Sequence, residues 1–229
     1  MEEIKKEKFL ENSTNPIFLE GTEIITNQMK KSVCKILLSN GQKNSGFFCK
    51  IPYPDNAHLL PALVTCNFII GKDLLTEGSI INISLNDDKE MKEIKITSSR
   101  KTYTNEKYCF TFIELIPEDK IDDFLEIDQN VFKSDELLKN IYIKSSIYVL
   151  HYLKGNKVAY SSGLLSELDD FNIHHLCNTD NGSSGGPILC SDTFKVIGIH
   201  AGTSHNFNLN RGILIKPAIV QFIQSNIGH

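Results

Sequence analysis

Residues 181–187, Asn-Gly-Ser-Ser-Gly-Gly-Pro, constrain the fold of this chain more than any other stretch. Glycine adopts backbone conformations that cost other residues energy, so these closely spaced glycines predict a sharp loop. In such a loop the backbone NH groups of Gly182 and Ser184 can point at one spot, where they stabilise a carbonyl oxygen that gains negative charge. Glycine- and serine-rich turns also occur in ordinary loops, so the flanking sequence decides the interpretation.

Strand-like segments lie on both sides of this loop and earlier in the chain. Before the loop, residues 173–180 read Ile-His-His-Leu-Cys-Asn-Thr-Asp, and after it residues 194–202 read Phe-Lys-Val-Ile-Gly-Ile-His-Ala-Gly. The earlier segments are residues 44–51 (Asn-Ser-Gly-Phe-Phe-Cys-Lys-Ile), 60–70 (Leu-Pro-Ala-Leu-Val-Thr-Cys-Asn-Phe-Ile-Ile) and 108–115 (Tyr-Cys-Phe-Thr-Phe-Ile-Glu-Leu). Short apolar runs of this kind, rich in β-branched and aromatic residues, indicate β-strands.

In this order the segments resemble the trypsin-like (chymotrypsin-fold) serine proteases, and specifically their intracellular, disulfide-free relatives. The loop is similar to the family sequence Gly-x-Ser-Gly-Gly-Pro, which implies that Ser184 is the nucleophile and that Gly182 and Ser184 form the oxyanion hole. Residues 44–51 resemble the early Gly-Thr-Gly-Phe strand of the family. The resemblance covers residues 30–228.

Two members of the family's catalytic triad are replaced in this chain. Residues 60–70 resemble the segment Leu-Val-Thr-x-x-His-Val-Ile, whose catalytic histidine falls on Phe68. Residues 108–115 resemble the strand Asp-x-Thr-x-Ile-Glu, whose orienting aspartate falls on Cys109. A serine hydroxyl is a poor nucleophile until a base takes its proton, and in the triad an imidazole held by a carboxylate does so. The resemblance therefore implies a pseudoprotease, inactive in proteolysis, that serves as a peptide-binding, protein-binding or regulatory module.

The alternative is an active serine endopeptidase that cuts after Glu, Asp or Gln and uses a rearranged base. Cys66, two residues before the base position, is one candidate, although a small buried core residue explains it as well. The histidines of the chain are the others: His58, His151, His174, His175, His200, His205 and His229. A general base must lie about 2.6 to 3.2 Å from the atom whose proton it takes, which is a demanding geometry.

The resemblance also implies a binding pocket. In relatives that cut after glutamate, a histidine on the strand after the loop and a threonine five residues before the serine contact the side chain that precedes the cut. Those positions are His200 and Thr179 here. A hydroxyl and an imidazole both donate hydrogen bonds, so they suit a carboxylate or a carboxamide. The predicted partner is a protein or peptide with an acidic or Gln side chain, unless His200 is simply satisfied by a backbone carbonyl.

The fold that the resemblance implies is all-β, with two packed six-stranded antiparallel barrels of the chymotrypsin type and a C-terminal helix. A chain of 229 residues with 41% hydrophobic content can bury a core of that size. Apolar residues at helical spacing after Pro217 predict the helix. The expected divisions are an N-terminal arm or lead-in (1–32), the first barrel (33–125), a linker (126–140) and the second barrel with the helix (141–229).

Composition narrows the partners and the compartment. The net charge is −4 with a pI near 6.0, and the lysines form no basic stripe, so nucleic acid is not the expected partner. The six cysteines form no CxxC pair and no zinc-spaced cluster, so we expect no metal and no cofactor. No apolar run approaches the ~20 residues of a membrane span. The charged first residues lack an apolar signal region, which predicts a cytoplasmic protein with reduced thiols.

Overall fold

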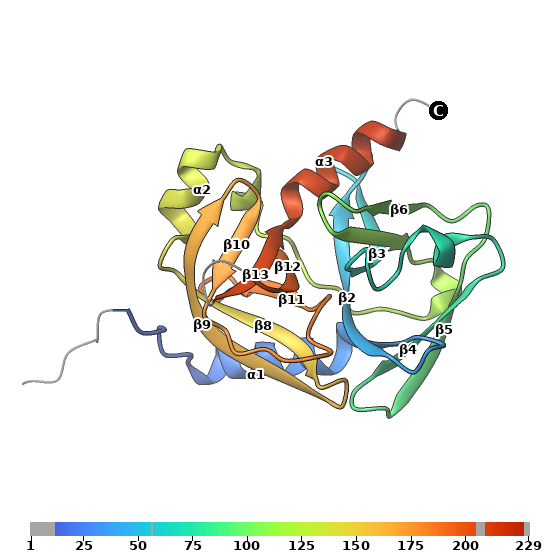
Figure 1. Ribbon diagram of the computed structural model, residues 1–229, viewed down its shortest axis with the longest axis horizontal. Helices are drawn as coiled ribbons and strands as arrows, with labels where there is room; N and C mark the ends of the chain where they lie inside the picture. The colour runs from blue at the N-terminus through green and yellow to red at the C-terminus, as the bar shows by residue number, and fades with distance from the viewer. Residues whose placement is uncertain (1–11, 56, 205–208, 227–229) are drawn as a thin grey trace, which may run out of the picture.

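The computed structural model describes residues 12–55, 57–204 and 209–226, and it shows two β-sheet units side by side (Figure 1). Residues 1–11 of the predicted N-terminal arm lie outside this description. A helix precedes the first sheet, α1 (Leu19–Lys31), and another ends the described chain, α3 (Ile215–Asn226). None of the described helices is long and apolar enough to cross a membrane.

The first unit is an antiparallel sheet of seven strands in the order β5-β4-β1-β2-β3-β7-β6. Their bounds are β1 (Val33–Leu37), β2 (Lys43–Pro52), β3 (Leu59–Thr65), β4 (Ile80–Leu85), β5 (Glu90–Lys95), β6 (Thr102–Asn105) and β7 (Phe110–Glu114). Short 3-10 helices, η1 (Lys72–Leu75) and η2 (Pro117–Asp119), lie in its connections. Its curled inner face buries apolar side chains such as Phe47, Phe112 and Ile113.

The predicted double-barrel fold is confirmed, and its first unit is a curled half-barrel of seven strands rather than six, in which β5 and β6 at the two ends do not pair with each other. The chain between them is held elsewhere by Arg100, whose buried guanidinium pairs with the carboxylate of Asp119 at 2.7 Å. The segment around η2 lies beside β5 instead, where Lys92 Nζ donates a hydrogen bond to the Lys120 carbonyl oxygen at 2.7 Å. A buried ion pair and a connecting segment therefore take the place of the closing strand pair.

The second unit is a closed six-stranded barrel in the order β10-β13-β12-β11-β8-β9, as predicted. Its strands are β8 (Ser146–Leu153), β9 (Lys157–Asp169), β10 (Asn172–His175), β11 (Pro187–Cys190), β12 (Val196–Thr203) and β13 (Asn210–Leu214). The 3-10 helix η3 (Gln129–Phe132) and helix α2 (Asp135–Tyr142) connect the two units. All residues of β8 except the last are buried, since its two faces pack against the barrel interior and against neighbouring segments.

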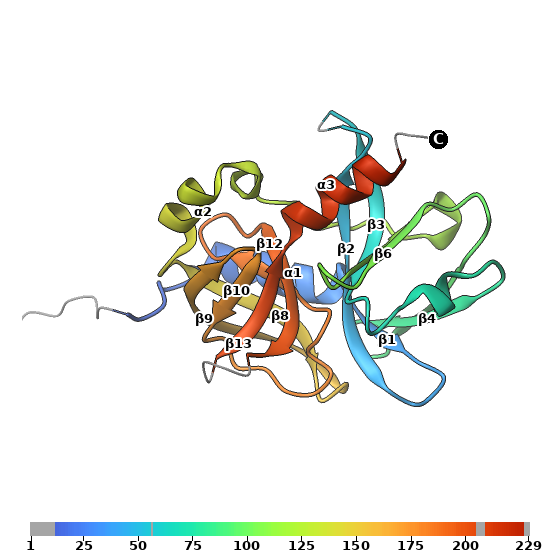
Figure 2. The same ribbon diagram turned by 45° about the horizontal axis from the view of Figure 1, so that its top comes forward.

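Both terminal helices contact the second unit, and α3 also joins it to the first sheet. Gln28 of α1 accepts a hydrogen bond from the Tyr148 hydroxyl at 2.8 Å and donates one to the Phe194 carbonyl oxygen at 2.9 Å, both in the second unit. The predicted C-terminal helix is present as α3, which runs from the second barrel across to the first sheet (Figure 2). There Phe222 packs against the rings of Tyr103 and Phe112. Full burial of such a side chain contributes about 2 to 3 kcal/mol, so α3 stabilises the docking of the two units.

Candidate functional site

The loop of residues 181–186 lies where the two units meet, and β2 holds it from the side. Ser45 NH donates to the Ser184 carbonyl oxygen at 3.0 Å, and Ser45 Oγ donates to the Gly182 carbonyl oxygen at 2.7 Å. Both Gly182 (φ 84) and Gly185 (φ 87) have left-handed backbone angles. A Cβ on Gly185 would overlap the Ser45 carbonyl oxygen. Glycine is therefore required for the conformation and for the close approach of β2.

Two NH groups of this loop are free to bind a ligand. The loop's other NH groups are engaged: Ser183 NH bonds to the Asp180 carbonyl oxygen at 3.0 Å and Gly185 NH to the His200 carbonyl oxygen at 2.9 Å. The NH groups of Gly182 and Ser184 donate to no acceptor in the described part of the chain. These are the two groups that the sequence assigns to the oxyanion hole, and an unengaged pair is what that role requires.

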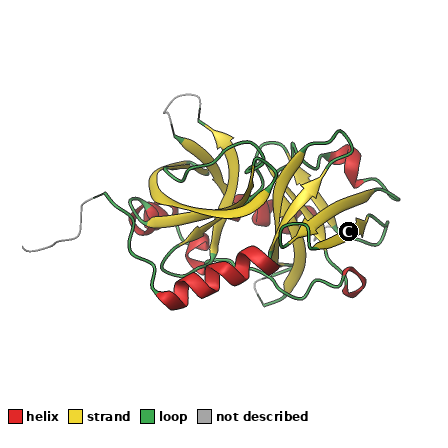
Figure 3. Cartoon of the chain, turned by 90° about the horizontal axis from the view of Figure 1, so that it is seen from below, coloured by secondary structure: helices red, strands yellow, loops and turns green. Residues whose placement is uncertain are grey.

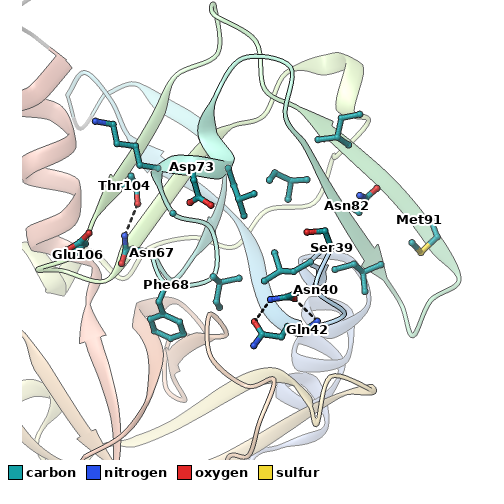
Figure 4. A pocket seen from close by; sticks show the side chains of 18 residues that line it. Ser39, Asn40, Gln42, Asn67, Phe68, Asp73, Asn82, Met91, Thr104 and Glu106 are labelled. Carbon is teal, nitrogen blue, oxygen red and sulfur yellow. Dashed lines mark hydrogen bonds between the residues drawn. The ribbon is translucent and has the colours of Figure 1, made fainter.

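Phe68 stands exposed beside the loop. It lies at the apex of a turn after β3, in which the Cys66 carbonyl oxygen accepts hydrogen bonds from the NH groups of Ile69 (3.0 Å) and Ile70 (3.2 Å). Its ring is 59% exposed. It lines a cavity of about 1090 Å³ that it shares with Asn40 and Asn67 (Figure 4). It also lines a second cavity of about 610 Å³, which Gly182 reaches. An apolar ring thus occupies the place expected for the catalytic base.

Cys109, at the aspartate position, is buried and faces another thiol. Its carbonyl oxygen accepts a hydrogen bond from Asn67 NH at 3.3 Å. A hydrogen bond with Cys66 is the main cause that lowers the pKa of the Cys109 thiol, and the charge of Arg211 adds to it. Burial raises the pKa of Cys66, whose Sγ also lies 3.4 Å from the His200 carbonyl oxygen. Sulfur and a guanidinium surround this position, and no described imidazole hydrogen-bonds to it.

No histidine in the described ranges hydrogen-bonds to the Ser184 hydroxyl. His151 Nδ1 instead lies 2.6 Å from Oγ of the neighbouring Ser183, and both residues are fully buried. His58 is exposed in the turn between β2 and β3, where it pairs with Asp55 at 2.9 Å. His205 and His229 lie outside the described residues. The rearranged base of the alternative hypothesis is therefore not found among the described histidines.

The predicted pocket residues lie on two different segments of the second unit. Thr179 is half-buried in the segment between β10 and the loop, and His200 on β12 is 2% exposed. His200 Nδ1 lies 3.2 Å from His175 Nε2, while His175 Nδ1 accepts a hydrogen bond from Cys177 NH at 3.3 Å. His175 therefore carries its proton on Nε2 and donates it, which leaves His200 with an Nε2 proton to donate. The partner of His200 is a second imidazole rather than a backbone carbonyl.

Burial keeps this imidazole network neutral. It lowers the pKa of both His151 and His175 to about 4 and lowers the pKa of His200 well below its usual range. From the sequence, His151 and His175 were candidates only for a rearranged base, and neither the contact of His175 with His200 nor that of His151 with Ser183 was predicted. The only sequence signal for the contact with His200 was the pair of neighbouring histidines in residues 173–180. Strand pairing in the barrel decides which of the two contacts His200. The described residues hold no cluster of three side chains suited to a metal ion.

Comparison with solved structures identifies the fold. No family model matches the sequence, and no curated protein matches it. The serine endoprotease from Yersinia pestis superposes with a TM-score of 0.63 at 10% identity, covering 91% of this chain and 68% of that one. The inactive form of the Rv3671c protease gives 0.62 at 14% identity, covering 96% and 100%. A serine-to-alanine mutant of Rv3671c from M. tuberculosis, also inactive, gives 0.62 at 14% identity, covering 93% and 96%. This chain therefore has the double-barrel fold of the chymotrypsin-type serine proteases.

Proposed function

We propose that this chain is a pseudoprotease that binds an extended peptide or protein segment in the cleft where its fold relatives cut their substrates. The observation that carries the proposal is the exposed Phe68 at the base position, beside a nucleophile loop that keeps its shape. Without a base the Ser184 hydroxyl stays protonated at neutral pH, so it does not attack a carbonyl carbon. The free NH groups of Gly182 and Ser184 remain able to donate hydrogen bonds to a carbonyl oxygen of a bound peptide.

The edge of β12 supports the binding of an extended peptide. Strand β11 pairs with β12 only as far as Pro187 opposite Ile199. Beyond that pair, the loop around Ser184 is hydrogen-bonded to the backbone of His200. On that side, residues 201–203 have no strand neighbour in the described part of the chain, while β13 pairs with their other edge. Peptides commonly add to such an edge through main-chain hydrogen bonds, and pockets for alternate side chains then supply specificity.

We assign the specificity of the cleft to Thr179, His200 and Phe68. The NH donor on His200 Nε2 and the hydroxyl of Thr179 suit an acidic or Gln side chain. Because the imidazole is neutral, it does not strongly favour a charged carboxylate over an uncharged carboxamide. The Phe68 ring supplies an apolar surface on the other side of the loop. The partner is thus a peptide with Glu, Asp or Gln next to an apolar residue.

A reducing compartment such as the cytoplasm suits a chain whose cysteines are all free thiols. All six cysteines are buried free thiols: Cys34, Cys49, Cys66, Cys109, Cys177 and Cys190. Disulfides persist mainly in oxidising compartments, and reduced thiols are typical of cytosolic proteins. The alternative function is proteolysis after Glu, Asp or Gln with a rearranged base, and only the intact loop favours it. The two functions are distinguished by whether a bound peptide is cut.

Peptide binding without cleavage is the expected result. Fluorescein-labelled peptides that carry Glu, Gln or Lys at one position are titrated with the protein, affinity is measured by fluorescence anisotropy, and peptide mass is checked after incubation. Glu and Gln peptides should bind more tightly than the Lys peptide and stay intact. Phe68→Ala should weaken binding by about tenfold, since losing a partly buried ring costs about 1 to 2 kcal/mol.

Phe18→Ala is the matched control, because Phe18 is also an exposed phenylalanine (81%) but lies before α1, away from the loop. It should leave peptide affinity unchanged. The binding proposal is wrong if Phe68→Ala and Phe18→Ala have the same effect. The inactivity proposal is wrong if the native chain cuts the Glu or Gln peptides and Ser184→Ala does not.

A further inference from the structure

Cys66 and Cys109 are held side by side by two paired strands of the first sheet. Cys66 follows β3 and Cys109 precedes β7, and these strands pair with Thr65 opposite Thr111. The hydrogen bond from Asn67 NH to the Cys109 carbonyl oxygen (3.3 Å) continues the pairing by one step beyond the strands. Backbone hydrogen bonds between the two strands therefore hold the two cysteines at neighbouring positions.

The backbone of Cys109 brings the two sulfur atoms together. In regular pairing Asn67 and Cys109 would share one face of the sheet, and Cys66 would point to the other face. Cys109 instead has a left-handed φ of 55°, at the end of a turn closed by its NH and the Glu106 carbonyl oxygen at 3.2 Å. Its side chain is therefore not held to the alternation, and its thiol comes close enough to the Cys66 thiol for their interaction to lower the pKa of Cys109.

The surroundings give the two thiols different roles. The hydrogen bond from Cys66 and the charge of Arg211 lower the pKa of Cys109, so it is the thiol that ionises first. Cys66 is fully buried, which raises its pKa and keeps it protonated. A low-pKa thiol next to a second thiol is the arrangement of an oxidation-sensitive site, in which one sulfur attacks and the other resolves.

The other cysteines lack this environment. Burial raises the pKa of Cys34, Cys49, Cys177 and Cys190, and the contacts described for their sulfur atoms are with backbone carbonyl oxygens or polar side chains rather than with a second thiol. Cys109 is also 6% exposed, whereas Cys66 has no exposed surface. A molecule as small as hydrogen peroxide is the oxidant that suits such restricted access.

We propose that Cys66 and Cys109 form a dithiol oxidation site that peroxide converts to a disulfide. The Cys109 thiolate attacks one peroxide oxygen and the O–O bond breaks, so Cys109 becomes a sulfenic acid. The hydroxide that leaves takes up the proton that Cys109 released on ionising and becomes water. Cys66 sulfur then attacks the Cys109 sulfur and displaces the hydroxyl group, which takes the Cys66 proton and leaves as a second water. Both thiols are oxidised and one peroxide is reduced to two waters. The disulfide joins the segment that carries Phe68 to the start of β7.

The test is peptide mapping by mass spectrometry after treatment of the folded native chain with hydrogen peroxide, with and without later reduction by dithiothreitol. We expect one disulfide, between the peptides that contain Cys66 and Cys109, which dithiothreitol reverses. The other thiols should stay free. The proposal is overturned if the pair stays reduced while the protein is oxidised elsewhere, or if the disulfide joins a different pair. This measurement needs no variant, so a folding defect cannot obscure it.

Two variants assign the order of the steps. In Cys66→Ser, dimedone should trap a sulfenic acid on Cys109, because no thiol is left to resolve it. In Cys109→Ser, Cys66 should not react with dimedone. Cys190→Ser is the matched control, a buried cysteine of the second barrel, and it should form the disulfide at the native rate. Trapping on Cys66 in Cys109→Ser would contradict the assigned roles.

Discussion

Acidification through the range from pH 6.5 to pH 4 is expected to remove several kcal/mol from the free energy of unfolding. His151, His175 and His200 lie together in the second barrel, and each is at most 2% exposed. In the folded state none of them is solvated well enough to carry a charge, whereas in the unfolded chain each one binds a proton freely.

The direction of the effect follows from the pKa values. The ordinary histidine pKa is 6.5, and burial lowers that of His151 and His175 to about 4. Between these limits the unfolded chain binds more protons than the folded chain, so stability falls as the pH falls. One pKa unit corresponds to about 1.4 kcal/mol, so each of the two histidines costs about 3 kcal/mol at the acid end of the window.

Urea unfolding at a series of pH values measures this loss. His151→Gln should make the curve of unfolding free energy against pH flatter in the window, even if the variant is less stable at every pH. His58→Gln is the control, because His58 is exposed and lies outside the buried imidazole cluster. It should flatten the curve less than His151→Gln does. A native chain equally stable across the window, or a His151→Gln slope equal to the native one, would contradict the prediction.

Gly185→Ala is expected to destabilise the fold by about 3 kcal/mol or more. An alanine at φ 87 costs about 1 to 2 kcal/mol for the left-handed backbone alone. The new Cβ would also overlap the Ser45 carbonyl oxygen and crowd the Thr65 hydroxyl. Those two groups are hydrogen-bonded to each other at 2.9 Å. The loop must then move away from β2, which breaks the contacts that hold the NH groups of Gly182 and Ser184 in place.

Gly78→Ala separates the two contributions. Gly78 has nearly the same backbone angle, φ 88, but nothing lies within 4 Å of an added Cβ. It should cost only the backbone part, about 1 to 2 kcal/mol, in thermal or urea unfolding. Equal losses for the two variants would mean that the close approach of β2 to the loop is not tight, and the account of the site would need revision.

The sequence predicted the elements that depend on local pattern. The loop around Ser184 follows from the glycine positions, and the C-terminal helix follows from the apolar spacing after Pro217. The second barrel was predicted from the resemblance to the chymotrypsin-fold proteases. The unclosed first sheet did not follow, because it depends on which strands pair at its two ends. The Arg100–Asp119 ion pair in its connections did not follow either, because neither residue stands in a recognisable motif. Charge pairs between loops leave no periodic signal in one sequence.

The contacts inside the candidate site were also beyond sequence reasoning. The sequence singled out Cys66 and Cys109 separately. Their proximity depends on the left-handed backbone of Cys109, at the end of the turn that precedes β7. The His175 and His200 contact depends on two strands, β10 and β12, that meet only through the closed barrel. Long-range pairing of this kind is set by the fold as a whole.

Labelling with a fluorophosphonate probe tests the central claim most directly. The probe reacts with serine hydroxyls that a neighbouring base activates. The native chain and Ser184→Ala are incubated with it side by side, trypsin serves as the positive control, and intact mass reports the labelled fraction. Cooperative unfolding of both samples shows that they are folded. We predict no labelling of Ser184 above the level in Ser184→Ala. Complete labelling of Ser184 in the native chain would show that a base activates it, and the pseudoprotease account would be wrong.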